Sequence, residues 1–181
     1  MNALSSIPLS ISKLKITIAP PKPQAAIDSQ ILIYTDGACI GNPGPGGWAF
    51  VIQRRAGGQV IKELVLSGSG PERTTNNCME MEAVIAALLQ VRKGEAAAIT
   101  IRTDSQLVVK GVNEWIAGWQ AKGWKGAKKK PIANRDLWEQ ILALAEGKNI
   151  TWEWVKGHAG DPLNEKVDGL AEAAARRATR S

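Results

Sequence analysis

Four acidic residues of this chain could form one cluster, although they lie so far apart in the sequence that only folding can bring them together. Asp36, Glu80, Asp104 and Asp168 are separated by 44, 24 and 64 residues. Each lies at the end of an expected strand or in the first turns of an expected helix. Carboxylates crowded into one pocket repel each other, and a hard divalent cation such as Mg²⁺ relieves the repulsion. Two such ions about 3.5–4 Å apart can activate a water and stabilise the leaving oxygen in phosphodiester hydrolysis, so the four acids are candidate metal ligands.

Taken singly, each acid also has a structural explanation. Asp36 fits a polar turn residue that ends its strand. Glu80 fits a capping-box pair with Asn77 at the start of a helix, and Asp104 fits the cap of the segment after it. Asp168 fits a favourable charge near the positive end of a helix dipole. Four acids at the ends of elements that meet at one edge of the sheet are harder to explain by chance. Their placement therefore favours a single site that all four share.

The only histidine of the chain, His158, lies in the sequence Lys156-Gly157-His158-Ala159-Gly160, shortly before Asp168. A lone histidine is commonly a plain surface residue. A loop histidine close to acids also suits a proton shuttle, because its charge changes near neutral pH. We therefore treat His158 as a candidate catalytic residue.

The elements that must position these residues change from strands to alternating helices and strands. Apolar runs predict an antiparallel meander of strands at 31–35, 48–53 and 60–66, with a turn at Gly57-Gly58. Helices are expected at 78–89, about 106–122, 135–146 and 164–177, and further strands at 99–101 and 150–155. This order predicts an α/β fold, a mixed sheet with helices on both faces.

Residues 1–30 differ in composition from the rest. They hold three lysines and one acid, and the stretch Ala19-Pro20-Pro21-Lys22-Pro23 is typical of a linker. The alternation of Leu14, Ile16 and Ile18 also fits a short extra strand. Serine and lysine with few acids fit an organelle-targeting segment, although arginine is absent, and no continuous apolar run of a signal peptide is present. We expect an N-terminal extension over 1–30 and a catalytic domain over 31–181.

The bulk composition is that of a globular domain, with 44% hydrophobic and 22% charged residues in 181. No stretch of about 18 apolar residues occurs, so we expect no membrane span. The net charge of +6 favours a polyanionic partner. The two cysteines, Cys39 and Cys78, form no metal-binding spacing and favour a reducing cytoplasm. We expect a cytoplasmic monomer.

Four motifs, in order and with compatible spacing, resemble those of ribonuclease H type 1, the bacterial ribonuclease HI family. The resemblance runs from about Ile31 to Ala175. The motifs are Thr35-Asp36-Gly37-Ala38 with Gly41-Asn42-Pro43-Gly44, residues 74–80 (Thr-Thr-Asn-Asn-Cys-Met-Glu), Thr103-Asp104-Ser105-Gln106, and residues 152–160 (Trp-Glu-Trp-Val-Lys-Gly-His-Ala-Gly) with Asn164, Glu165 and Asp168.

The resemblance implies a ribonuclease H-like mixed five-stranded sheet, of order 3-2-1-4-5 with strand 2 antiparallel, flanked by helices. It implies an endonuclease that hydrolyses the RNA strand of RNA–DNA hybrids by a two-metal-ion mechanism and leaves 5′-phosphate and 3′-hydroxyl ends. Asp36, Glu80, Asp104 and Asp168 would hold two Mg²⁺ ions, with Mn²⁺ as a substitute. His158 would assist proton transfer or product release.

The resemblance also implies contacts with the hybrid. Amides both donate and accept hydrogen bonds, so they can address 2′-hydroxyls and base edges without fixing a sequence. Ala133 departs from bacterial relatives, which often have lysine at this position. The residues that match minor-groove positions of the family are Cys39, Asn42, Asn76, Asn77, Gln106 and Asn134.

The segment at about 115–134 resembles the basic handle with which bacterial members grip the DNA strand. From Lys110 to Arg135 there are seven basic residues and one acid, Glu114. This one-sided charge favours binding of the hybrid's phosphates. Core packing is the favoured interpretation of Trp115, Trp119 and Trp124, with Trp115 kept as a candidate contact. The lysines expected to bind the hybrid are Lys125, Lys128, Lys129 and Lys130.

Two other functions have to be distinguished from this one. A resolvase or integrase of the same fold would share the acids but not the Thr-Thr-Asn-Asn and Lys-Gly-His-Ala-Gly stretches. A binding module without activity would lack one of the carboxylates, and all four are present. The glycine-rich turn at 37–47 lacks the Gly-Lys-Ser/Thr ending of a Walker A loop, which excludes a nucleotide-phosphate loop of that type.

Overall fold

The computed structural model describes residues 29–179 of the chain. The extra strand expected around Leu14, Ile16 and Ile18, and most of the expected extension over 1–30, lie outside the described residues. None of the helices within 29–179 is long and apolar enough to cross a membrane.

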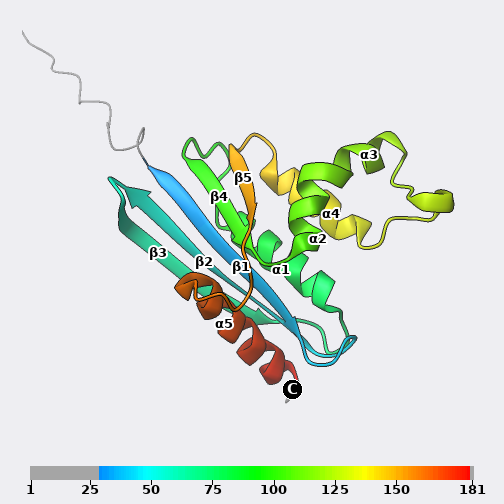
Figure 1. Ribbon diagram of the computed structural model, residues 1–181, viewed down its shortest axis with the longest axis horizontal. Coiled ribbons are helices and arrows are strands. Elements are labelled where there is room, and N and C mark those ends of the chain that lie inside the picture. Colours follow the sequence, from blue (N-terminus) through cyan, green and yellow to red (C-terminus); the bar gives the residue numbers. More distant parts are fainter. Residues whose placement is uncertain (1–28, 180–181) are drawn as a thin grey trace, which may run out of the picture.

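A single five-stranded sheet of order β3-β2-β1-β4-β5 organises the described chain (Figure 1). Strand β2 is antiparallel to both of its neighbours, whereas β1, β4 and β5 run parallel. The expected α/β class, strand order and antiparallel second strand are therefore confirmed. The strands are β1 (Gln30–Cys39), β2 (Gly46–Ala56), β3 (Gln59–Ser69), β4 (Ala98–Thr103) and β5 (Ile150–Trp154).

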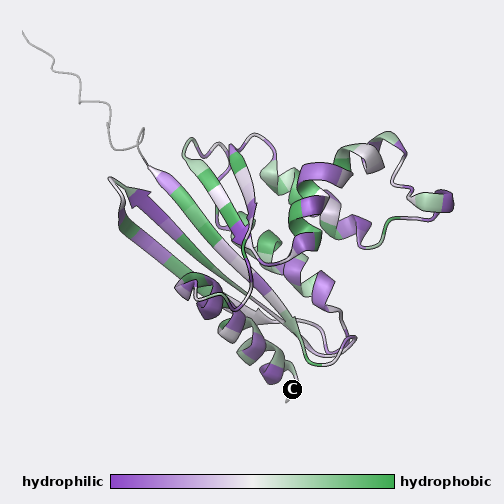
Figure 2. Cartoon of the chain, in the orientation of Figure 1, coloured by the Kyte–Doolittle hydropathy of each residue, from purple (hydrophilic) through white to green (hydrophobic). Residues whose placement is uncertain are grey.

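Helices cover both faces of this sheet, because β1 carries apolar side chains on alternate faces. Ile31 and Ile33 join the larger core, which contains residues of α1 (Asn76–Leu89) and α4 (Arg135–Ala145). Leu32 and Tyr34 pack in the second core with residues of α5 (Pro162–Ala178). Figure 2 shows the hydrophobic residues of β1 and β4, which lie between the helices on the two faces of the sheet.

Two glycines allow α1 and α5 to approach the strand backbones closely. A Cβ atom at Gly37 of β1 would lie 2.1 Å from the carbonyl carbon of Met79 in α1. A Cβ atom at Gly47 of β2 would lie 2.2 Å from the backbone nitrogen of Ala175 in α5. Side chains at either position would push the helix away, so both glycines determine how deep the helices lie.

The helix starts differ from the expected ones. The hydroxyl of Thr75 caps α1 by accepting a hydrogen bond from the backbone N–H of Cys78 at 3.3 Å. The expected capping pair of Asn77 with Glu80 is therefore wrong. It is Ser105, and not Asp104, that caps α2 (Gln106–Lys110), because the Ser105 hydroxyl accepts from the N–H of Val108 at 3.4 Å.

The single helix expected at 106–122 is in fact three segments. A π-helical turn, η2 (Gly111–Trp115), separates α2 from α3 (Ile116–Ala121). The break begins at Gly111, where a Cβ atom would lie 2.2 Å from the ring of Trp138. From this point the chain projects from the sheet, and the turn η3 (Ala127–Lys129) lies at its hydrophilic tip (Figures 1 and 2).

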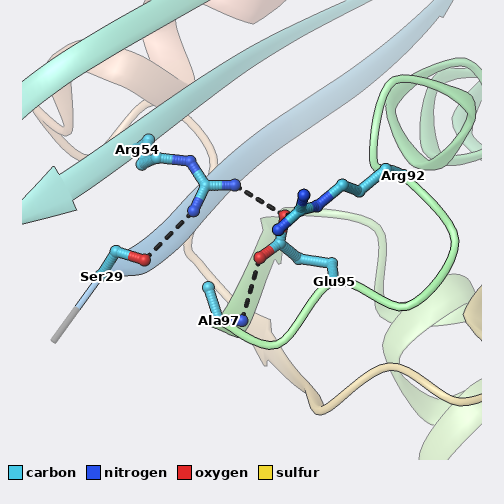
Figure 3. Close-up of polar contacts among 5 residues, drawn as sticks. All are labelled: Ser29, Arg54, Arg92, Glu95 and Ala97. Atoms are coloured by element: carbon cyan, nitrogen blue, oxygen red, sulfur yellow. Dashed lines mark hydrogen bonds and ion pairs between the residues drawn. The ribbon is translucent and has the colours of Figure 1, made fainter. Parts of the chain in front are cut away.

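A buried carboxylate fixes the loop between α1 and β4 near the amino end of β1 (Figure 3). Glu95, whose side chain is 3% exposed, accepts from Arg54 at 2.7 Å, from Arg92 at 3.3 Å and from the backbone N–H of Ala97 at 3.0 Å. Arg54 also donates to the Ser29 hydroxyl at 3.1 Å. Burial alone would raise the pKa of Glu95, but these donors outweigh it and hold the pKa below its ordinary value.

Candidate metal and catalytic centre

Three carboxylates from three different elements converge at one place. Asp36 lies in the second half of β1, Glu80 in α1, and Asp104 directly after β4. One ligand oxygen of each lies within 4.8 Å of the others. The strand does not end at Asp36 as expected, because β1 goes on pairing with β2 as far as Cys39. The expected convergence of these three acids is nevertheless present.

The fourth acid reaches the same pocket from α5, on the other side of the sheet. Asp168 lines it together with Asp36, Glu80 and Asp104. Glu172 also lines this pocket and was missed by sequence reasoning. Its position four residues after Asp168, on the same face of a helix, was the available signal.

Burial, and then the charges of the neighbouring acids, raise the pKa of the two most buried carboxyl groups. Burial, followed by the charges of Asp104 and Asp168, raises the pKa of Asp36 to about 8, although the N–H of Gly37 donates to it at 2.9 Å. Burial, followed by the charges of Asp36 and Asp104, raises the pKa of Glu80 well above its ordinary value. Both shifts mean that the folded chain disfavours several bare negative charges here and favours a proton or a cation.

The donor set fits a hard divalent cation. Among residues 29–179, the buried side-chain oxygens without a hydrogen-bond partner are those of Thr35 and Asn164 and Oε2 of Glu80. The other oxygen of Glu80 accepts a long hydrogen bond, 3.5 Å, from the amide of Asn76. Mg²⁺ and Mn²⁺ prefer carboxylate oxygens, and either ion would satisfy the unpaired oxygen and relieve the repulsion.

The end of β5 and the loop after it run close to Asp104. The indole N–H of Trp154, which is 46% exposed, donates to the backbone oxygen of Asp104 at 3.0 Å. A Cβ atom at Gly157 would lie 2.6 Å from Oδ2 of Asp104, so only glycine leaves this carboxylate its space. Sequence reasoning did not assign a role to Trp154, because alternation within a strand does not distinguish it from its neighbours.

His158 lies at the rim of the acid cluster. Its side chain is 80% exposed, and Nδ1 lies 3.5 Å from Oδ2 of Asp168. Its backbone has φ of +51°, the left-handed region, within a tight loop. His158 therefore contacts both solvent and one of the four acids, and a group that moves protons between the site and solvent needs both contacts.

Three of the candidate substrate contacts surround the glycine-rich turn. Asn42 Oδ1 accepts from the backbone N–H of Asn76 at 3.3 Å and so links this turn to α1. The thiol of Cys39 donates to the backbone oxygens of Gly44 and Thr74, both at 3.3 Å. Cys39 and Asn76 also line the acid pocket. The structure thus brings Cys39 and Asn76 beside the acids, and Asn42 beside Asn76.

The other three candidates lie on different elements. Asn134 precedes α4 with φ of +54°, and its Oδ1 lies 3.5 Å from the thiol of Cys78 in α1. Asn77 and Gln106 are exposed at the starts of α1 and α2. None of these three lines the acid pocket in the described chain.

Tryptophans form the base of the projecting segment. Trp119 contacts Trp115, Trp124 and Trp138 with ring centroids 5.7, 6.4 and 5.5 Å apart. Trp124 is buried and Trp119 packs against the larger core, which confirms the core-packing interpretation for these two. Trp115 is half-buried at the end of the row.

Four lysines form the tip of this segment, and we call the region at about 115–134 the basic handle. The tip is closed by backbone hydrogen bonds from Gly126 to Lys130 and from Ile132 to Trp124. Its charges therefore stand on a folded loop. All four side chains are exposed, namely Lys125, Lys128, Lys129 and Lys130.

Comparison with protein families identifies relatives of nearly the whole described chain. The family model described as RNase H matches residues 28–176. A ribonuclease H of Treponema pallidum subsp. pallidum is 50% identical over 159 residues, which cover 83% of this chain and 94% of that protein. A ribonuclease H of Polaromonas naphthalenivorans is 46% identical over 165 residues, which cover 90% of this chain and 98% of that protein.

Solved structures with the same fold agree. LC9-RNase H1, described as a type 1 RNase H with the type 2 active-site motif, is 32% identical with a TM-score of 0.72, over 82% of this chain and 72% of that one. LC11-RNase H1, solved in complex with an RNA/DNA hybrid, is 27% identical with a TM-score of 0.60, over 83% of this chain and 99% of that one.

Proposed function

Because this chain belongs to the ribonuclease H family, it is an enzyme that cleaves the RNA of RNA–DNA hybrids, and we propose that its acid cluster performs this cleavage by hydrolysis. The observation that carries the proposal is the convergence of Asp36, Glu80 and Asp104 within 4.8 Å, in a pocket that Asp168 also lines. Cleavage within the RNA strand would leave 5′-phosphate and 3′-hydroxyl ends.

Asp36, Glu80, Asp104 and Asp168 would hold two Mg²⁺ ions, with Mn²⁺ as a substitute. The raised pKa values of Asp36 and Glu80 and the unpaired Glu80 oxygen support this assignment. When bound, the ions would supply an activated water and stabilise the leaving 3′-oxygen.

The protein's own groups would orient the substrate and move protons. His158 is exposed and lies 3.5 Å from Asp168, so its Nδ1 can carry a proton between the site and solvent and assist product release. The carboxylates would contribute their charge and their fixed positions on packed strands and helices, and none of them would act as the nucleophile.

A surface of polar and basic groups would bind the hybrid. The amides and the Cys39 thiol would face the minor groove and its 2′-hydroxyls. Trp115 and the handle lysines would hold the DNA strand through its phosphates. The related LC11-RNase H1, solved with an RNA/DNA hybrid, supports a partner of this kind. The minor-groove set is Cys39, Asn42, Asn76, Asn77, Gln106 and Asn134.

The same proposal covers the organisation of the chain. Residues 1–30 would be an extension, and residues 31–181 a catalytic domain with the basic handle at about 115–134. The enzyme would act as a monomer in the cytoplasm.

The test is incubation with an RNA–DNA hybrid labelled on either strand, with Mg²⁺ or with a chelator. We expect cuts in the RNA strand only, dependent on the ion, with 3′-hydroxyl ends. Cuts in a labelled DNA strand would favour a resolvase-type nuclease instead. Products with 2′,3′-cyclic phosphate would contradict the mechanism, because they would show attack by the RNA's own 2′-hydroxyl.

A further inference from the structure

A polar network on the α5 side of the sheet joins four elements at the level of the acids. The Tyr34 hydroxyl of β1 donates to Oδ2 of Asp161 at 2.6 Å and accepts from Nη1 of Arg102 in β4 at 3.0 Å. Nε of Arg102 donates to Oε2 of Glu153 in β5 at 2.7 Å. We call Tyr34, Arg102, Glu153 and Asp161 the Tyr34 network.

Two of the three strand members of this network, Tyr34 and Arg102, lie next to candidate metal ligands in the sequence. Tyr34 precedes Asp36 by two positions, so both side chains lie on the same face of β1. Arg102 precedes Asp104 by two positions at the end of β4. Movement of either strand residue would therefore be passed directly to a metal-binding carboxylate.

Asp161 connects Tyr34 to α5, because each of its two carboxylate oxygens binds one of them. Oδ1 caps the helix by accepting from the backbone N–H groups of Leu163 at 3.0 Å and Asn164 at 3.3 Å. Oδ2 accepts from Tyr34. Asp168 follows Asp161 by seven residues, which is two helical turns, so the two acids lie on the same side of α5.

The helix and β1 therefore meet at two successive points. Tyr34 contacts Asp161, and farther along the strand the charge of Asp168 acts on Asp36. The first of these contacts is a short hydrogen bond to a carboxylate, and such charge-assisted bonds are about twice as strong as neutral ones. The second is repulsive whenever both carboxylates are charged, and a proton or a cation relieves it. A repulsive contact keeps its geometry only if something nearby holds the two elements together.

We propose that the Tyr34 network is a positioning device for the metal site. It holds the start of α5, and with it Asp168 and the His158 loop, against the strands that carry Asp36 and Asp104. This inference rests on the proposed function, because it takes Asp168 as a ligand of the catalytic ions.

The chain offers a matched control at the other end of β1. Arg54 donates to Glu95 at 2.7 Å, as Arg102 does to Glu153, and the two arginine side chains are 31% and 36% exposed. Figure 3 shows this ion pair, which lies beside Ser29. Its loss should destabilise the fold without touching the acid cluster.

The experiment compares Tyr34→Phe, Arg102→Gln and Arg54→Gln in the full chain. Three quantities are measured: Mn²⁺ affinity of the hybrid-free protein by calorimetry, kcat and KM for a hybrid, and the thermal midpoint. For Tyr34→Phe and Arg102→Gln we expect about 10-fold weaker Mn²⁺ binding and about 10-fold lower kcat, with KM unchanged. Loss of a group that orients a metal ligand directly costs about 10–100-fold, and these two residues act through the strands, so the low end applies. For Arg54→Gln we expect a lower midpoint, with Mn²⁺ affinity and kcat of the wild type.

Two outcomes would overturn the inference. If Tyr34→Phe and Arg102→Gln lowered only the thermal midpoint, the network would be structural and nothing more. If Arg54→Gln lost as much Mn²⁺ affinity as they did, general loosening would be the cause. Failure of the proposed function is distinguishable, because the wild-type protein itself would then leave the hybrid RNA uncut.

Discussion

At the scale of single residues, the acid cluster sets stability against function. Asp36→Asn or Asp104→Asn should abolish most hybrid cleavage and leave the fold intact. Removing one crowded charge should keep or raise the stability of the metal-free protein, and a gain of about 1 kcal/mol corresponds to about 2–4 °C in the thermal midpoint. Cleavage assays and thermal unfolding in chelator measure both effects. An unfolded Asp36→Asn protein, or one with near-normal turnover, would contradict the metal-site assignment.

Glu80→Gln should be nearly inactive as well. Thr75, and not Asn77 with Glu80, caps α1, so this substitution should carry no capping cost.

The metal-free protein should lose stability as the pH rises. The pKa of Asp36 is raised from 3.8 to about 8, and that of Glu80 is raised in the same direction. Between about pH 4 and pH 8 the folded state therefore binds more protons than the unfolded state, and the free energy of unfolding falls with increasing pH. Thermal midpoints recorded in chelator across this range measure the slope.

Two comparisons isolate the cause of that slope. Asp36→Asn should reduce it, and saturating Mg²⁺ should restore stability at neutral pH. If Asp36→Asn kept the wild-type slope, the raised pKa of Asp36 could not be its origin.

His158→Ala should slow turnover less than Asp36→Asn does. A group that transfers protons contributes about 10²–10⁴-fold at most, whereas the carboxylates create the metal site itself. The measurement is kcat at saturating hybrid and Mg²⁺. Loss of activity as complete as in Asp36→Asn would show that this ranking of the two roles is wrong.

At the scale of the elements, the depth of α1 against β1 places Glu80 beside Asp36. In Gly37→Ala the new Cβ would lie 2.1 Å from the carbonyl carbon of Met79 and 2.2 Å from the nitrogen of Glu80. Both are backbone atoms, so the helix must move and carry Glu80 with it. We expect a loss of about 1–3 kcal/mol in the free energy of unfolding, together with a large fall in kcat.

Gly118→Ala in α3 is the control for Gly37→Ala. A Cβ atom at Gly118 would meet nothing within 4 Å, so the substitution should gain up to about 1 kcal/mol from helix propensity. Wild-type midpoint and kcat in Gly37→Ala would refute the role assigned to this close approach.

Local patterns predicted most elements but not the points where distant elements meet. Thr75 and Asn77 are both good capping residues in one polar run, and local preference does not choose between them. The π-helical turn at Gly111 coincides with the ring of Trp138, 27 residues away, which a period of 3.6 residues does not reveal.

In the candidate site too, local patterns predicted some residues, and contacts between distant elements could not be predicted. Acids at the expected ends of strands and helices signalled their own convergence, because the ends of neighbouring strands meet at one edge. Tyr34, Arg102 and Asp161 looked like ordinary strand and turn residues. Their hydrogen bonds span 68 and 127 residues of sequence, and only the folded sheet brings them together.

At the scale of the whole molecule, the positive charge expected to bind the hybrid lies on the handle, whereas the acid cluster is negative. Changing Lys125, Lys128, Lys129 and Lys130 together to alanine should weaken hybrid binding far more than it lowers kcat at saturating hybrid. Each lost phosphate contact should reduce the slope of log affinity against log salt by roughly 0.7–0.9 in magnitude. Binding measured over a range of salt concentrations tests this.

Sequence preference should change little in the quadruple variant, because lysines that bind phosphates do not read bases. The same KM and the same salt slope as the wild type would show that the four lysines are only a solvated face of the handle.

Strand β1 separates the amino end of the described chain from the acid cluster. It begins at Gln30, directly after Ser29, whose hydroxyl accepts from Arg54, and it carries Asp36 seven residues after Ser29. At about 3.3 Å per residue this is a separation of about 23 Å. A surface anchor joined at the amino end of β1 would therefore sit away from the acids. Single immobilised molecules could then take up long hybrids from solution, and successive cuts by one molecule could be timed.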